Sequence, residues 1–359
     1  MTNQISHYRP VLLARQGERL ALQDLSDEDH EKFTPVFVVP PRAWNYDNED
    51  YDKTLEQHVQ KLPTELAKAR GKYPAFLDLL FLNDESGEVY GQHPLRWICA
   101  AAAKEGLELT PVITPGSPEG LIRAAHDLIE ETGIGVALRL FPKEWPSADP
   151  KGFHSFLIDL GIGTENVNLI LDLGPDTATE LTLRALVPEI EWALANGSWK
   201  SLTVAGAGMP KELPAGKGVH TIDRSDWETF QNARRLVERN PLTTLDFADY
   251  GVAGFDPSVE INPRFLNISA SFRYTTENSW LFARGDLFKG NGGRSLGGAA
   301  VAPMLTALRS HGSYGLTERD AANEWIDGVI AGGSGGNSTV WRRWGTFHHV
   351  KTVLGQLAN

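Results

Sequence analysis

The stretch VNLILDLGPD, residues 167–176, is a nearly continuous apolar run that ends on a charge. Asp172 lies among five apolar residues, and a Gly-Pro break follows. Apolar runs of this length are typical of parallel strands that are buried on both faces. A carboxylate in such a place costs several kcal/mol to desolvate unless it is paired. The stretch therefore predicts a buried strand and a partner for Asp172 elsewhere in the fold.

Seven other segments between residues 8 and 251 have the same apolar character. Helix-like amphipathic segments fill most of the gaps between them, at a period of about 30–40 residues. This alternation predicts an α/β fold, a (β/α)8 TIM-type barrel over residues 1–256, rather than a doubly wound sheet. Neither a GxGxxG motif after the first strand nor a Walker A motif competes with that fold. The predicted strands are 9–15, 33–41, 75–82, 108–116, 135–141, 167–174, 201–208 and 245–251.

The pattern changes beyond residue 260. We predict a β-rich segment with a turn at 277–278, a glycine-rich loop at 290–299, and helices within 316–333 and 338–357. Residues 257–359 are therefore expected to form a C-terminal extension that packs on the barrel or closes its mouth.

The composition is that of a globular protein, with 359 residues of which 41% are hydrophobic. The 34 Lys and Arg against 46 Asp and Glu give a formal charge of −12, which argues against direct nucleic-acid binding because Lys and Arg supply most of that affinity. The single cysteine, Cys99, excludes a disulfide within the chain and favours a reducing compartment. No signal-peptide core or membrane-length apolar window is present, so we expect a cytoplasmic protein without membrane contact. No cofactor is expected.

Catalytic and ligand-binding groups of parallel barrels collect at the carboxyl ends of the strands. Charged residues stand at most of the predicted strand ends, where opposite charges would keep each other ionised. We expect them to converge on one mouth, where three interpretations stay open: a salt-bridge network that plugs the barrel, a site for a small anionic or polar ligand, or a divalent metal held by two aspartates. The candidate catalytic residues are Glu18, Asp172 and Asp249, and the candidate ligand-binding residues at strand ends are Arg15, Arg42, Asp78, Arg139 and Tyr250.

Two further candidates come from the extension. Alternation in NISASFRYT, residues 267–275, places Arg273 opposite the apolar face of a strand, where it can reach a carboxylate or an external anion. His348 and His349 are adjacent, so on a helix they point about 100° apart and cannot form an i, i+4 zinc pair. We therefore predict Arg273 and His348 as ligand-binding residues.

Several motifs, taken in order, resemble the Beta protein family, which is named for a gene of a satellite phage and also occurs in prophages and bacterial genomes. The resemblance rests on YRPVLLARQGERLALQDL, FTPVFVVPP, DYG at 249–251, FRYTTENSWLFARG and GTFHHV, and it runs over nearly the whole chain. The family has Lys in the opening motif where this chain has Arg15, which argues against a Schiff-base role there. The matching positions are Arg15, Gly17, Glu18, Pro40, Pro41, Asp249, Tyr250, Gly251, Arg273, Tyr274, Thr275, Trp280, Gly285, His348 and His349.

The resemblance implies a context more than a chemistry. The satellite-phage member is encoded beside a lethal gene and a small regulator, in a locus associated with phage exclusion. One hypothesis is therefore a component of anti-phage defence, or of a toxin-antitoxin pair, that acts with a partner protein encoded nearby. The other is a barrel enzyme, a hydrolase or lyase, that acts on a small anionic or phosphorylated substrate at the C-terminal mouth. The two hypotheses are compatible.

Overall fold

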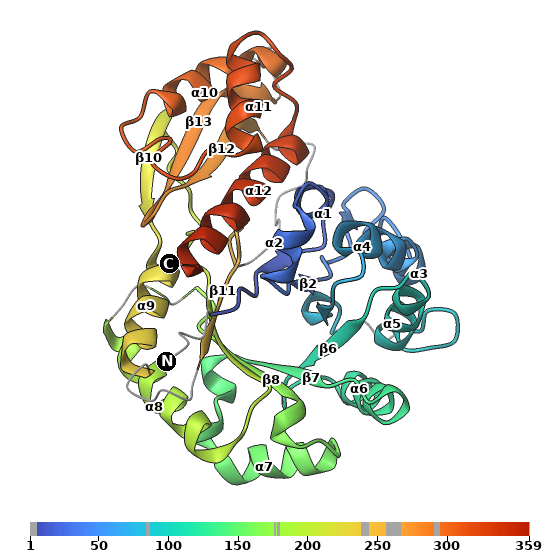
Figure 1. Ribbon diagram of the computed structural model, residues 1–359. Helices are drawn as coiled ribbons and strands as arrows, with labels where there is room; N and C mark the ends of the chain where they lie inside the picture. The colour runs from blue at the N-terminus through green and yellow to red at the C-terminus, as the bar shows by residue number, and fades with distance from the viewer. Residues whose placement is uncertain are drawn as a thin grey trace.

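A computed structural model describes residues 6–83, 87–175, 177, 180–237, 244–255, 267–290 and 295–358. Eight parallel strands form one sheet whose strand order follows the chain (Figure 1). Phe247 in the last strand hydrogen-bonds the backbone of residues 7 and 9, just before the first strand, at 3.0 and 2.7 Å, which closes the barrel. All eight predicted strands are confirmed. They are β1 (Val11–Leu13), β2 (Val36–Val38), β5 (Ala75–Asp78), β6 (Leu109–Ile113), β7 (Val136–Leu140), β8 (Val167–Asp172), β9 (Ser201–Gly206) and β11 (Leu245–Asp249).

Helices alternate with these strands and surround the sheet (Figure 1). Local sequence sets their ends: α5 begins at Pro94, and α6 ends before Gly133, whose φ of 69° favours glycine. Among the described residues, no helix has the length and apolar character that crossing a bilayer needs. The helices of the barrel region are α1 (Gln16–Gln23), α2 (Asp27–Glu31), α3 (Leu55–Val59), α4 (Leu62–Arg70), α5 (Pro94–Lys104), α6 (Glu119–Thr132), α7 (Pro150–Asp159), α8 (Glu180–Asn196) and α9 (Ser225–Val237).

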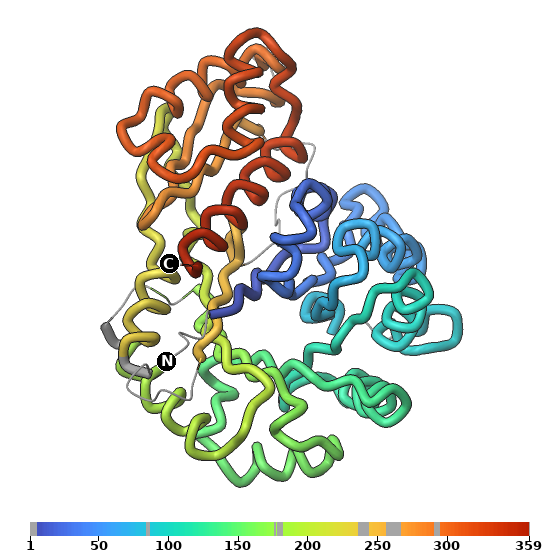
Figure 2. The backbone as a smooth tube through the Cα atoms, in the orientation of Figure 1, coloured from blue at the N-terminus to red at the C-terminus, as the bar shows by residue number. Residues whose placement is uncertain are grey.

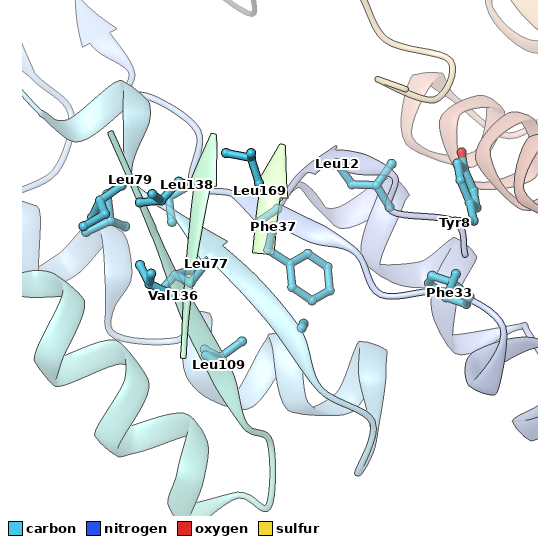
Figure 3. Packing of buried hydrophobic residues seen from close by; sticks show 14 of the residues in the cluster. Tyr8, Leu12, Phe33, Phe37, Leu77, Leu79, Leu109, Val136, Leu138 and Leu169 are labelled. Atoms are coloured by element: carbon cyan, nitrogen blue, oxygen red, sulfur yellow. The ribbon is translucent and has the colours of Figure 1, made fainter. Parts of the chain in front are cut away.

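Strand residues alternate between two apolar clusters, which explains their continuous apolar character. Leu77, Leu138 and Leu169 belong to the large cluster between sheet and helices (Figure 3). Phe76 and Ile170, one position away, belong to a smaller cluster inside the barrel. Because side chains alternate along a strand, the parity of a position decides which cluster it joins.

A second, antiparallel sheet lies beside the barrel, in the order β10 (Gly218–Asp223), β13 (Ser279–Lys289), β12 (Ile268–Thr275). The predicted turn at 277–278 joins β12 to β13. The helices α10 (Val301–Arg309) and α11 (Ala321–Ile330) share an apolar cluster with this sheet. Strand β10 was not predicted, and it precedes α9, so the small sheet takes one strand from within the region expected to form the barrel.

The C-terminal helix α12 (Ser338–Leu357) belongs to both parts of the molecule. Trp341 near its start packs in the core of the small sheet, whereas Phe347, Val350 and Leu354 pack in the core of the barrel. Figure 2 shows this helix passing between the blue N-terminal helices and the gold α9. It therefore takes the place of the eighth barrel helix, and the small sheet is inserted ahead of it. A short hairpin, β3 (Trp44–Asn45) and β4 (Asp50–Tyr51), was not predicted either.

Candidate functional site

Asp172 has its partners at the centre of the barrel mouth. Arg139 donates from Nε to Asp172 Oδ2 at 2.7 Å, from Nη1 to Asp78 Oδ2 at 2.5 Å, and from Nη2 to the Tyr250 hydroxyl. Tyr250 in turn donates to Asp172 Oδ2 at 2.7 Å. Burial disfavours the charge of Arg139, but Tyr250, Asp172 and Asp78 together raise its pKa well above the usual value. We call these four residues the mouth plug.

The mouth plug is closed and fully bonded. The remaining carboxylate oxygens accept backbone N–H groups, Asp78 from Leu80 and Asp172 from Gly174, both at 2.8 Å. Beside Arg139 and Tyr250 the cavity measures only about 10 Å³, room for at most one water. Of the three interpretations of the mouth, this arrangement fits the salt-bridge plug.

Asp249 lies in a separate cluster, on the outer side of the sheet. It accepts a hydrogen bond from the Tyr8 hydroxyl at 2.7 Å and from His349 Nε2 at 2.8 Å. Thr275 Oγ1 lies 2.9 Å from His349 Nδ1, so the ring bridges β11 and β12. Burial lowers the pKa of His349, while the pKa of Asp249 is lowered, against the effect of burial, by His349, Arg224 and Tyr8.

His348 continues this cluster away from the barrel. Its Nδ1 lies 2.6 Å from Asp320 Oδ2, and its Nε2 lies 2.9 Å from the carbonyl oxygen of Thr275. Asp320 also accepts backbone N–H groups at the start of α11, so it caps that helix as well as contacting His348. His348 stacks on Tyr274 at 4.0 Å between ring centroids.

Next to Asp249 lies a group of buried polar atoms without hydrogen bonds. Asp226 is 3% exposed, and neither of its carboxylate oxygens has a hydrogen-bond partner, although the backbone amides of residues 226 and 227 are close enough to lower its pKa slightly. The same holds for Nε and Nη2 of Arg224 and for the indole N–H groups of Trp227 and Trp280. Burial and the charge of Asp249 raise the pKa of Asp226 to about 7. We call these four residues the orphan cluster.

A third cluster joins α1, β12 and α12. The buried Glu18 lies 3.6 Å from Arg342 Nε, and its Oε2 has no partner. The charges of Glu18 and Arg342 influence the pKa of Arg15 and the pKa of Arg273. Burial and the charge of Arg342 lower the pKa of Arg273 to about 9, and its buried Nε has no partner. Three guanidinium groups thus lie within electrostatic reach of one carboxylate, and we call this set, Arg15, Glu18, Arg273 and Arg342, the arginine cluster.

The arginine cluster lies at the ends of the first and last barrel strands. Arg15 follows β1 by two residues, and Arg342 donates from Nη1 to the carbonyl of Val252, three residues beyond β11, at 3.2 Å. Gly17 permits the close approach of α1 to α12, because a Cβ there would lie 2.7 Å from side-chain atoms of Arg342.

The predicted site residues therefore fall into separate groups rather than one mouth. Asp78, Arg139, Asp172 and Tyr250 form the plug, and Arg15, Glu18 and Arg273 join the arginine cluster. Asp249 and His348 belong to a chain of hydrogen bonds that runs through His349 and Thr275 and joins the barrel to the small sheet. Arg42 lies on the β3–β4 hairpin side, with its guanidinium 3.7 Å from the ring centroid of Tyr51. Within the described residues no group of three or more His, Cys, Asp or Glu side chains could hold a metal ion.

A family model described as Beta protein matches residues 8–355. The chain belongs to the Beta protein family. Most of the positions that carry the family resemblance lie near the meeting point of β11, β12, α1 and α12, in the arginine cluster and around Asp249 and the two histidines. No curated protein matches the sequence. A solved structure described as a sugar phosphate isomerase/epimerase from Parabacteroides distasonis is similar over 73% of this chain and 91% of its own, at 11% identity and a TM-score of 0.33, too loose a likeness to carry an argument.

The sequence did not single out Arg342, Arg224 or Asp226. Arg342 stands in the WRRW segment, where nothing separates it from Arg343, which pairs with Asp24 instead. Asp226 stands in the first turn of a helix, where an acidic residue normally needs no further explanation. Only its burial without a partner distinguishes it.

Proposed function

We propose that the protein binds a small anionic ligand, phosphorylated or carboxylated, at the arginine cluster and acts on it as a barrel-type hydrolase or lyase. The observation that carries this proposal is the surplus of two positive charges around Glu18. Guanidinium groups held together without matching carboxylates repel one another, and an anion relieves that repulsion. The N-terminus of α1, which no side chain caps, adds a partial positive charge to the same place.

Each residue has a role in this proposal. Arg15, Arg273 and Arg342 clamp the anion, since guanidinium groups match the oxygens of carboxylates and phosphates. Glu18 is the acid–base group, because its Oε2 is buried and free of hydrogen bonds. Asp249 and the mouth plug hold in place the strands whose carboxyl ends lie beside the arginine cluster.

Phosphate binding tests the proposal through two opposite changes of charge. Inorganic phosphate is titrated by calorimetry at low salt into the wild-type protein and the variants Arg273→Gln and Glu18→Gln. Arg273→Gln is expected to weaken binding about tenfold, because it removes one charge-assisted contact. Glu18→Gln is expected to strengthen binding and to abolish turnover, because it removes the negative charge and the acid–base group.

Arg96→Gln is the matched control. Arg96 pairs with Asp127 and Glu131 on the surface, so the variant carries the same change of net charge at a distant position. It should bind phosphate as the wild type does. Absence of phosphate binding by the wild type, or equal losses in Arg96→Gln and Arg273→Gln, would exclude the arginine cluster as an anion site.

The family context supports a second proposal, a defence or toxin-restraining role with a partner protein. The formal charge of −12 suits a basic partner. Co-expression with a neighbouring gene and affinity purification would show the complex, and phage plating would show the phenotype. A protein that never co-purifies with a neighbour and leaves phage plating unchanged has no such role.

A further inference from the structure

A cavity of about 590 Å³ lies between α9, α12 and the segment 316–321, and none of its lining residues belongs to the arginine cluster. Trp227 and Gln231 of α9, Phe347, Lys351 and Gln356 of α12, and Glu277 of the β12–β13 turn are among its lining residues. Its size is that of small-molecule sites, which often lie where two structural parts meet. The wall combines aromatic surface with polar groups, so it suits a ligand with an apolar body.

The orphan cluster lies directly behind this wall. Arg224 donates from Nη1 to Gln356 Oε1 at 2.7 Å and to the carbonyl of Glu277 at 3.3 Å, and both of these partners line the cavity. Its guanidinium carbon also lies 5.3 and 5.7 Å from the ring centroids of Trp227 and Trp280. The Gln356 side chain and the backbone of Glu277 thus lie between the cavity and the Arg224 guanidinium.

The unbonded atoms of the cluster define a ligand. Nε and Nη2 of Arg224 are the two donors on one edge of the guanidinium, the edge that binds a carboxylate with two parallel hydrogen bonds. The indole N–H groups of Trp227 and Trp280 add donors, whereas Asp226 supplies acceptors. A matching molecule carries a carboxylate and, close to it, a hydrogen-bond donor.

Gly208 lets the backbone just beyond β9 pack directly against Asp226. A Cβ on Gly208, just beyond β9, would lie 2.3 Å from Asp226 Oδ1 and 2.9 Å from Trp280. Burying six unbonded polar atoms in one place costs folding free energy that a purely structural region has no reason to bear. Such costs are usual where a ligand supplies the missing bonds.

We propose that the α9–α12 cavity and the orphan cluster form a binding site for a small carboxylic acid that bears a hydroxyl or ammonium group on the adjacent carbon. Arg224 binds the carboxylate, Asp226 binds the hydroxyl or ammonium group, and the body of the ligand lies in the cavity against Trp227 and Phe347. Gln356 swings away from Arg224 when the ligand enters.

Three probes with the same phenylpropanoate skeleton test this site by calorimetry: phenyllactate with a hydroxyl group on the adjacent carbon, phenylalanine with an ammonium group there, and 3-phenylpropanoate with neither. The wild type should bind phenyllactate or phenylalanine about tenfold more tightly than 3-phenylpropanoate, and which one binds identifies the donor. Asp226→Asn should lose that preference while its melting temperature stays equal to or above that of the wild type. Binding of none of the probes by the wild type would overturn the proposal.

Glu228→Gln is the control, because Glu228 is exposed on the same helix and the variant has the same change of charge. Glu228→Gln should keep the preference for the donor-bearing acid. Loss of that preference in Glu228→Gln would overturn the assignment of Asp226 as the residue that binds the donor. If Asp226→Asn fails to fold, Trp227→Phe removes a single donor and should weaken binding several-fold. An unchanged affinity in Trp227→Phe would also count against the site. Phosphate binding at the arginine cluster should be unaffected by all of these variants, so the two proposals fail independently.

Discussion

The mouth plug and the orphan cluster are both buried groups that contain an arginine and an aspartate, yet they differ in how they are bonded. In the plug, Arg139 bridges two carboxylates and a tyrosine, and backbone amides satisfy the remaining carboxylate oxygens. In the orphan cluster, Arg224 and Asp226 lie near each other without meeting. Burial of charge alone therefore does not indicate function. Unmet hydrogen bonds are the feature on which the proposed ligand site rests, because a structural network normally satisfies its own members.

The largest expected effect is in the plug. Asp172→Ala leaves the Arg139 guanidinium buried with one carboxylate fewer, so the free energy of unfolding should fall by about 3–5 kcal/mol. Urea denaturation measures it. A loss below about 1 kcal/mol would mean that the plug is not a cooperative network and would remove the contrast with the orphan cluster.

Asp226→Asn is expected to increase the free energy of unfolding, and the size of the increase should depend on pH. The unfolded chain releases the Asp226 proton near pH 4, whereas the folded protein holds it until about pH 7, so the wild type loses stability as pH rises between these values. The asparagine variant lacks this titration. Its stability relative to the wild type should increase by roughly 2–3 kcal/mol from pH 5 to pH 8, measured by urea denaturation. A stability difference between variant and wild type that does not change with pH would show that the folded protein does not raise the pKa of Asp226.

A smaller loss is expected from Tyr250→Phe. The variant removes one donor to Asp172 and one acceptor for Arg139, but the ion pair between those two residues stays in place. The free energy of unfolding should fall by about 1–2 kcal/mol. If thermal denaturation shows a loss as large as that of Asp172→Ala, the hydroxyl rather than the ion pair holds the plug together.

Surface pairs should contribute least. Arg96→Gln breaks two exposed ion pairs, and the free energy of unfolding should change by less than about 1 kcal/mol, with less effect at high salt. A loss comparable to that in the plug would show that burial is not what separates the two classes of ion pair.

The division of the predicted site residues was accessible from strand parity. Asp78, Arg139, Asp172 and Tyr250 stand at even steps from residues of the inner cluster, such as Phe76 and Ile170, whereas Asp249 stands one step from the inner Ala248 and faces outward. The positions of these residues at strand ends, taken alone, predict that all of them lie at one mouth. Counting alternation as well would have separated Asp249 from the plug.

The barrel could be predicted from the amino-acid sequence alone, because strands buried on both faces are apolar at most positions and eight such runs are visible in the chain. The β12–β13 hairpin and the last helix could be predicted in the same way. The tertiary structure was needed to show that α12 serves as the eighth barrel helix, that β10 joins the other sheet, and which groups lie beside Arg342, Arg224 and Asp226. These depend on contacts between segments far apart in the chain, where each residue alone has the ordinary character of a surface charge. Asp172 could be predicted to need a partner, but which residue would serve was set by the closure of the barrel.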